Sequence, residues 1–148
     1  MIVAPIENNS HHILLDELQM QGFAKAMAQI LKPGRCVLLL GEMGVGKTTF
    51  TRYLVEALGS PDPVNSPTFS LVQRYDAAFP IYHMDLYRID SEKDLDHLAL
   101  TEYFDKTEAL VLVEWGERLV HLPYDFITLS FSYGESDFQR QVLVQGLV

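Results

Sequence analysis

Cysteine, positive charge and long hydrophobic runs are all scarce in this chain of 148 residues. The single cysteine, Cys36, excludes a disulfide within the chain, and its position at the head of an apolar run is typical of a buried, unreactive thiol. Such cysteine usage is typical of a reducing compartment, so we expect a cytoplasmic protein.

No apolar run is longer than the segments "CVLLL" and "ALVLV", whereas a membrane-spanning helix needs about 20 apolar residues. The first residues, "MIVAPIENNSHH", have neither a basic region nor a long apolar region of the kind found in secretory signals. We therefore expect neither secretion nor contact with a membrane.

Basic residues are outnumbered, with 11 Lys and Arg against 20 Asp and Glu, which gives a formal net charge of -9. A surface of this sign repels the phosphate backbone of RNA or DNA, so broad, sequence-independent binding to nucleic acid is disfavoured. A protein partner is the more natural expectation.

The length and the 48% hydrophobic content fit one compact domain over residues 1–148, which buries about 70% of its extended surface. Neither an internal repeat nor a low-complexity linker divides the chain.

The first helix is expected to begin at a capping box formed by Asp16 and Gln19 and to end before Pro33 and Gly34. Its apolar face is predicted to contain Leu18, Met20, Phe23, Met27, Ile30 and Leu31. The following segment, "RCVLLLG", is short and apolar, as in a buried strand. A second helix then carries apolar residues at helical spacing from Phe50 and ends near Gly59.

The turn between that strand and the second helix contains the sequence "GEMGVGKT", which fits the phosphate-binding pattern G-x-x-x-x-G-K-[ST] without a gap. Glycines let the backbone N–H groups surround phosphate oxygens, and the helix that follows presents its positive end to the same anion. Lys47 is expected to reach the β and γ phosphates, and Thr48 to ligate magnesium. The nucleotide-binding residues predicted here are Glu42, Met43, Gly44, Val45, Gly46, Lys47, Thr48 and Thr49.

An acidic ligand for the same magnesium ion is expected from Glu114, which follows the apolar residues 109–113. A carboxylate at the end of a second buried strand can hold magnesium directly or through water. Trp115 comes next, and two interpretations stay open: an anchor in the core, or a wall of the nucleotide site or of a partner surface.

In the segment "FPIYHMDLYRID", strand alternation places His83, Asp85 and Tyr87 on one face. Asp85 could orient the attacking water or support the magnesium ion, and Arg88 could offset charge on the transferring phosphoryl group. The alternative is a half-exposed strand with a solvated polar face.

For Thr68 and for the histidine pair near the N-terminus, a structural interpretation is preferred over a functional one. Thr68, in "NSPTFSLV", could sense the γ phosphate as switch loops do, although an ordinary turn is the better interpretation from spacing alone. His11 and His12 are taken as exposed polar residues, since no histidine or cysteine pair has the spacing of a metal site.

Four segments, "GEMGVGKTT", "VNSPTFSLVQRY", "HMDLYRI" and "LVEWGERL", occur in this order and together resemble the bacterial TsaE (YjeE) family of P-loop ATPases. The resemblance covers about residues 16–122. It implies a role in forming the threonylcarbamoyl group on the adenosine next to the anticodon of certain tRNAs. It also implies TsaD and TsaB as partners that carry out the transfer, with tRNA contacted only indirectly, through these partners.

The same resemblance implies roles for individual residues. Lys47 matches the phosphate lysine, and Thr48 and Glu114 match the magnesium ligands. Asp85 and Trp115 match positions important for activity. Glu42 stands where the family more often has Asp, a change that leaves the phosphate loop intact.

The expected fold is therefore α/β: a P-loop NTPase three-layer sandwich with a mostly parallel central sheet covered on both faces. The segments "FITLSFSY" and "QRQVLVQ" alternate about the turn "GESD", which predicts a closing antiparallel hairpin.

Three functions are compatible with these patterns. The first is a magnesium-dependent ATPase, with Lys47, Asp85 and Glu114 as its catalytic residues, slow alone and activated by its partners. The second is a small-molecule or nucleotide kinase that uses Asp85 as base, although no arginine-rich lid is visible. The third is a GTPase-like switch or passive nucleotide-binding subunit. Because the N-K-x-D element that selects guanine is absent, ATP is preferred over GTP.

Overall fold

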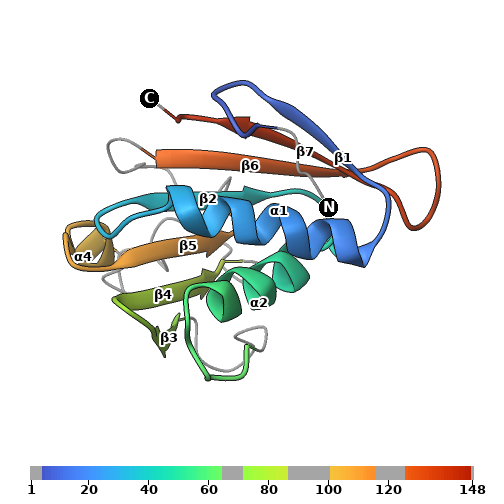
Figure 1. Ribbon diagram of the computed structural model, residues 1–148. Helices are drawn as coiled ribbons and strands as arrows, with labels where there is room; N and C mark the ends of the chain where they lie inside the picture. Colours follow the sequence, from blue (N-terminus) through green and yellow to red (C-terminus); the bar gives the residue numbers. More distant parts are fainter. Residues whose placement is uncertain (1–4, 65–71, 87–100, 116–125, 148) are drawn as a thin grey trace.

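The computed structural model describes residues 5–64, 72–86, 101–115 and 126–147, and these form one seven-stranded sheet with helices packed on it (Figure 1). The strand order across the sheet is β1-β7-β6-β2-β5-β4-β3. The strands are β1 (His11–Leu14), β2 (Cys36–Leu40), β3 (Val72–Asp76), β4 (Pro80–Asp85), β5 (Leu110–Glu114), β6 (Phe126–Tyr133) and β7 (Arg140–Gln145). The helices are α1 (Glu17–Ile30), α2 (Lys47–Ala57) and α4 (Thr101–Phe104).

The centre of the sheet is parallel and its edges are antiparallel. Strand β2 pairs in parallel with β5 and β6, and β4 pairs in parallel with β5. The pairs β6–β7, β1–β7 and β3–β4 are antiparallel. The predicted α/β class and the C-terminal hairpin are both confirmed, within a sheet that is mixed as a whole.

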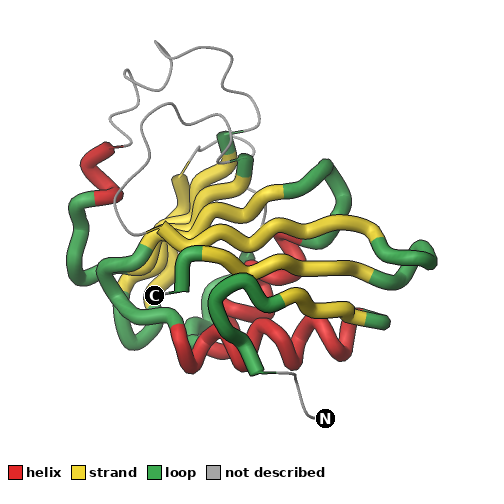
Figure 2. Tube along the Cα trace, turned by 90° about the horizontal axis from the view of Figure 1, so that it is seen from above, coloured by secondary structure: helices red, strands yellow, loops and turns green. Residues whose placement is uncertain are grey.

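The two long helices, α1 and α2, lie on the same face of the sheet (Figure 2). They bury Phe23, Met27, Phe50 and Leu54 against the inner residues of the strands. The other face carries a smaller apolar cluster, which α4 joins through Tyr103 and Phe104. No helix within the described residues is long and apolar enough to cross a bilayer.

Helix α1 begins as predicted, because the Asp16 side chain accepts a hydrogen bond from the Gln19 amide at 2.9 Å. The prediction for its apolar face was wrong at two positions. Leu18 is 64% exposed and Ile30 is 37% exposed, whereas Met20, Phe23, Ala24 and Met27 are buried. At about 100° per residue, Leu18 falls on the side opposite this stripe.

Strand β1 was not predicted, and it changes the interpretation of the two histidines before α1. His11 is exposed, as expected, but His12 is buried, contrary to the prediction. The alternation of a strand paired with β7 turns His12 inward, where its Nε2 lies 2.8 Å from Ser10 Oγ and its ring contacts Phe23. This burial, followed by the charge of His11, lowers the pKa of His12.

Cys36 lies at the start of the central strand β2 and is buried. Burial raises the pKa of its thiol to about 12, because the charged thiolate is poorly solvated there. The prediction of a buried thiol is confirmed, and the raised pKa agrees with the expectation that it is unreactive.

Candidate nucleotide site

The glycine-rich turn joins the central strand β2 to α2, as the sequence pattern predicted. Gly41 has φ +140°, and a Cβ at this position would lie 2.6 Å from the carbonyl oxygen of Phe131. Gly46 has φ +116° and caps the N-terminus of α2. Residues with a side chain rarely adopt these backbone angles, so both positions require glycine. The resulting loop exposes its N–H groups and the positive end of α2.

Lys47 is the first residue of α2 and is almost fully buried. Its ammonium group donates a hydrogen bond to the Gly41 carbonyl oxygen at 2.6 Å and lies 3.9 Å from the centroid of the Trp115 ring. Trp115 itself is partly buried and packs against the smaller apolar cluster. The ring is thus both packed in the core and a wall beside the lysine.

Thr48 and Glu114 meet although they are 66 residues apart in the chain. The Thr48 hydroxyl donates to the Glu114 carboxylate, at 3.3 Å from Oε1 and 3.4 Å from Oε2. Glu114 is the last residue of β5 and pairs with Leu39 on one side and Asp85 on the other. The structure therefore brings together a hydroxyl and a carboxylate, oxygen ligands of the type that magnesium prefers, and the strand register places Asp85 beside Glu114.

His83 is fully buried and contacts the same carboxylate, with 2.6 Å between its Nε2 and Glu114 Oε2. Its Nδ1 lies 3.1 Å from the Tyr75 hydroxyl, and that hydroxyl oxygen lies 2.8 Å from Gln73 Oε1. The interpretation of His83 as part of a solvated polar face is therefore wrong. Tyr75 and Gln73 were not predicted, although alternation in a hairpin read from "VQRYDAAFPIYHMD" would have placed them near His83.

The other side of the phosphate loop is supported by the hairpin of β6 and β7. Arg140 donates from Nε to the Val45 carbonyl oxygen at 2.9 Å, and its guanidinium carbon lies 4.5 Å from the centroid of the Tyr133 ring. The Tyr133 hydroxyl is 3.3 Å from the point that a Cβ on Gly44 would occupy. The roles of Arg140 and Tyr133 were not predicted, since nothing local in the sequence marks a contact such as that of Arg140 with Val45, 95 residues away.

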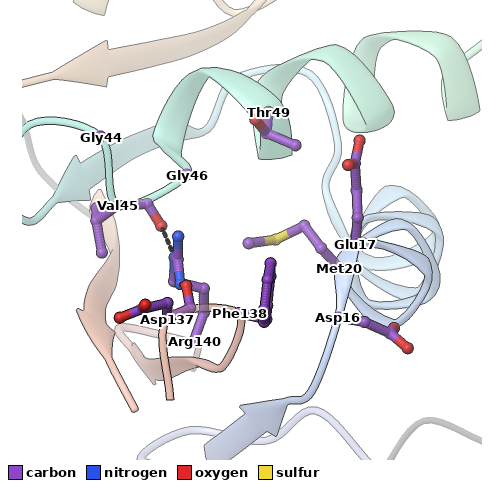
Figure 3. Close-up of a pocket in the computed structure, with 10 residues that line it drawn as sticks. All are labelled: Asp16, Glu17, Met20, Gly44, Val45, Gly46, Thr49, Asp137, Phe138 and Arg140. Carbon is purple, nitrogen blue, oxygen red and sulfur yellow. Dashed lines mark hydrogen bonds between the residues drawn. The ribbon is translucent and has the colours of Figure 1, made fainter. Parts of the chain in front are cut away.

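A pocket of about 260 Å³ opens beside the phosphate loop (Figure 3). Met20 from α1 and Phe138 from the β6–β7 hairpin both contribute apolar side chains to its lining. It is lined by Asp16, Glu17, Met20, Gly44, Val45, Gly46, Thr49, Asp137, Phe138 and Arg140. Its mixture of apolar walls and polar groups suits a small organic group attached to a bound phosphate.

Glu42 and Met43 lie in the loop, as the motif requires. Three predicted residues, Thr68, Tyr87 and Arg88, lie outside the described residues. The described geometry is that of a P-loop nucleotide-binding protein: a central parallel strand, a glycine cradle, a lysine, and a hydroxyl next to a carboxylate.

Comparison with known proteins identifies the family within the class of P-loop nucleotide-binding proteins. The model of the family described as "Threonylcarbamoyl adenosine biosynthesis protein TsaE" matches residues 14–142. The chain therefore belongs to the TsaE family, whose members are involved in forming threonylcarbamoyladenosine in tRNA.

Individual relatives agree with this placement. The chain is 44% identical to the tRNA threonylcarbamoyladenosine biosynthesis protein TsaE of Rickettsia bellii over 132 residues, which cover 87% of this chain and 90% of that protein. It is 44% identical to the Bacillus subtilis protein of the same name over 100 residues, or 67% of this chain and 61% of that protein. The crystal structure of Bacillus subtilis YdiB is similar with a TM-score of 0.74 and 28% identity, covering 96% of this chain and 88% of YdiB.

Proposed function

We propose that the chain is a magnesium-dependent ATPase that acts with TsaD and TsaB when the threonylcarbamoyl group is formed on the adenosine adjacent to the anticodon of tRNAs. The observation that carries the ATPase assignment is the contact between Thr48, at the start of the P-loop helix, and Glu114, at the end of the neighbouring strand. Family membership supports the pathway. The buried thiol of Cys36 is compatible with work in the cytoplasm.

Binding of the phosphates is assigned to the loop and to Lys47. The N–H groups at the N-terminus of α2 provide a cradle for anions that needs no side chain. In our proposal the ammonium group of Lys47 exchanges the Gly41 carbonyl oxygen for the β and γ phosphates. The ring of Trp115 limits where this ammonium group can move.

Thr48 and Glu114 would hold Mg²⁺, because their oxygens lie close together and are of the type that this ion prefers. When bound, the ion neutralises charge on the β and γ phosphates. Asp85 lies beside Glu114 in the strand register, and we assign it the orientation of the attacking water.

The adenosine part of the nucleotide is assigned to the pocket between α1, the loop and the hairpin. Met20 and Phe138 offer apolar surfaces for a base, and Thr49 lies in the same wall as the loop. Gly44, Val45 and Gly46 of the phosphate loop also line this pocket, so the pocket adjoins the phosphate cradle.

Hydrolysis by the chain alone should be slow. In this structure Lys47 is engaged by a carbonyl of the protein itself, so the phosphate site needs rearrangement before it is complete. Closure of the site by another protein would exclude water and fix the nucleophile, and NTPases activated in this way gain roughly a thousandfold or more.

The experiment is steady-state release of phosphate from labelled ATP by the chain alone, then with TsaD and TsaB, and then with tRNA alone. Acceleration only by the two proteins is expected, and Lys47→Ala should abolish it. Label in a phosphorylated metabolite would favour a kinase, and binding without turnover would favour a passive subunit. A fast rate for the chain by itself would contradict the proposed activation.

A further inference from the structure

A hydrogen-bonded chain of side chains crosses three neighbouring strands and ends on the proposed magnesium ligand. It runs from Gln73 and Tyr75 on β3, through His83 on β4, to Glu114 on β5. The antiparallel register pairs Gln73 with His83, and the parallel register brings β4 alongside β5. All the contacts therefore lie on one face of the sheet, the face covered by α2.

The middle of this hydrogen-bonded chain is shielded from water. Tyr75, His83 and Glu114 are all buried, with at most 3% of any of them exposed. A carboxylate in such a place needs hydrogen-bond donors, because it has lost those that water would supply. The environment thus makes the orientation of Glu114 depend on the few groups that touch it.

Among these groups, His83 makes the closer contact. Its Nε2 is 2.6 Å from Glu114 Oε2, whereas the Thr48 hydroxyl is 3.3 Å from Oε1 and 3.4 Å from Oε2. Since a carboxylate only accepts hydrogen bonds, the His83 Nε2–H is the donor. Oε2 therefore has a close donor in His83, whereas the Thr48 hydroxyl at the start of α2 is the donor described for Oε1.

We infer that His83, held in turn by the Tyr75 hydroxyl, is a positioning residue that presents Glu114 Oε1 to the magnesium ion of a bound nucleotide. The inference rests on the proposed function. Groups that hydrogen-bond to a metal ligand and fix its orientation typically contribute 10- to 100-fold to metal affinity, because they hold the ligand in its binding conformation in the absence of the ion. His83 itself does not contact the ion in this arrangement.

This role predicts a selective defect. The phosphate cradle consists of backbone N–H groups and Lys47, none of which touches His83 among the contacts described above. Loss of the His83 donor should therefore weaken binding of magnesium to the nucleotide complex while leaving binding of metal-free ATP unchanged.

The test compares ATP affinity by calorimetry in EDTA and in Mg²⁺, together with Mn²⁺ affinity of the nucleotide complex by electron paramagnetic resonance. His83→Leu removes the donor, and His83→Gln restores an N–H at a similar reach. Tyr75→Phe removes only the hydroxyl that holds His83. Tyr82→Phe is the matched control, because its hydroxyl binds exposed Arg74 instead.

We expect His83→Leu to weaken Mn²⁺ binding by about 10- to 100-fold, with ATP affinity in EDTA within about twofold of the original chain. His83→Gln should recover most of the loss, Tyr75→Phe should show a smaller loss of the same kind, and Tyr82→Phe should show none. If His83→Leu lowers the melting temperature enough to prevent the measurement, Tyr75→Phe and His83→Gln decide the question.

Metal affinity unchanged in His83→Leu and Tyr75→Phe would overturn the inference and leave the ATPase proposal intact. Equal losses with and without metal would also overturn it, because they indicate general disruption of the site. If the original chain itself binds ATP no better with magnesium than with EDTA, both the inference and the proposed function fail.

Discussion

At the scale of single residues, we expect Asp85 to act in turnover rather than in nucleotide binding. It pairs in the strand register with Glu114, the proposed magnesium ligand. Asp85→Asn keeps the shape and removes the charge, and we expect the maximal rate of hydrolysis to fall about 100-fold or more. ATP affinity should stay within about threefold. Single-turnover hydrolysis and equilibrium binding measure the two quantities separately.

Asp76→Asn is the control for that substitution, because Asp76 is an exposed aspartate at the end of the neighbouring strand β3. It should leave both quantities unchanged. A variant at Asp85 that lost ATP affinity but kept its maximal rate would show that the carboxylate serves binding.

His12 gives the chain a pH dependence of stability with a defined sign. Burial lowers the pKa of the folded histidine below the ordinary value of 6.5, so the unfolded chain takes up its proton first as the pH falls. The contribution of His12 to stability is complete above about pH 6.5 and is lost below it.

Urea unfolding at pH 7.5 and pH 5.5 measures this effect. The difference between the two free energies of unfolding should be smaller in His12→Gln than in the original chain. His11→Gln is the matched control, since His11 is exposed and affects His12 only through its charge. An equal pH dependence in the original chain and in His12→Gln would contradict the prediction.

At the scale of elements, the turn between β2 and α2 depends on a close backbone approach. A Cβ on Gly41 would meet the Phe131 carbonyl oxygen at 2.6 Å, whereas a Cβ on Gly59 would meet nothing within 4 Å. Both glycines have positive φ, so alanine is strained at either position by about 1–2 kcal/mol. Gly41→Ala should lower the free energy of unfolding by about 2 kcal/mol more than Gly59→Ala.

Urea unfolding of the two variants is the measurement. Because both positions have positive φ, the difference between them reports mainly the overlap of the Gly41 Cβ with Phe131 of β6 and with the Val45 side chain at 2.9 Å. Equal losses of stability would mean that the strand moves away at little cost.

Local patterns were sufficient to predict the elements on which the site is built. The glycine turn, the helix that starts at Lys47 and the strand that ends at Glu114 each have a complete signature within a few residues. Strand β1 escaped prediction because a four-residue strand has too little pattern, and it is defined by its partner β7. Arg140 and Tyr75 escaped for the related reason that their roles come from contacts across strands.

At the scale of the whole molecule, we expect the net charge of -9 to disfavour direct binding to tRNA. We expect binding to tRNA alone to be weaker than about 100 µM at ~0.15 M salt. Repulsion between like charges grows as salt is removed, so binding should weaken further at low ionic strength.

Fluorescence titration of labelled tRNA at two salt concentrations tests this expectation, with a mixture of the chain and its proposed partners TsaD and TsaB as the comparison. Binding by the isolated chain that strengthens as salt is lowered would indicate a basic surface and contradict it.

The position of β2 in the sheet has a consequence for synthesis on the ribosome. The strand that leads into the phosphate loop is flanked by β5 and β6, which are both translated after it. Gly41 packs against Phe131, and Val45 is held by Arg140. A nascent chain that has emerged only as far as the P-loop helix carries the motif without the neighbours that shape it. Pairing between strands that are distant in the sequence delays folding until late in translation. A nucleotide therefore cannot assist folding of the first half of the chain by binding to it. Prematurely terminated products would contain the motif without binding nucleotide.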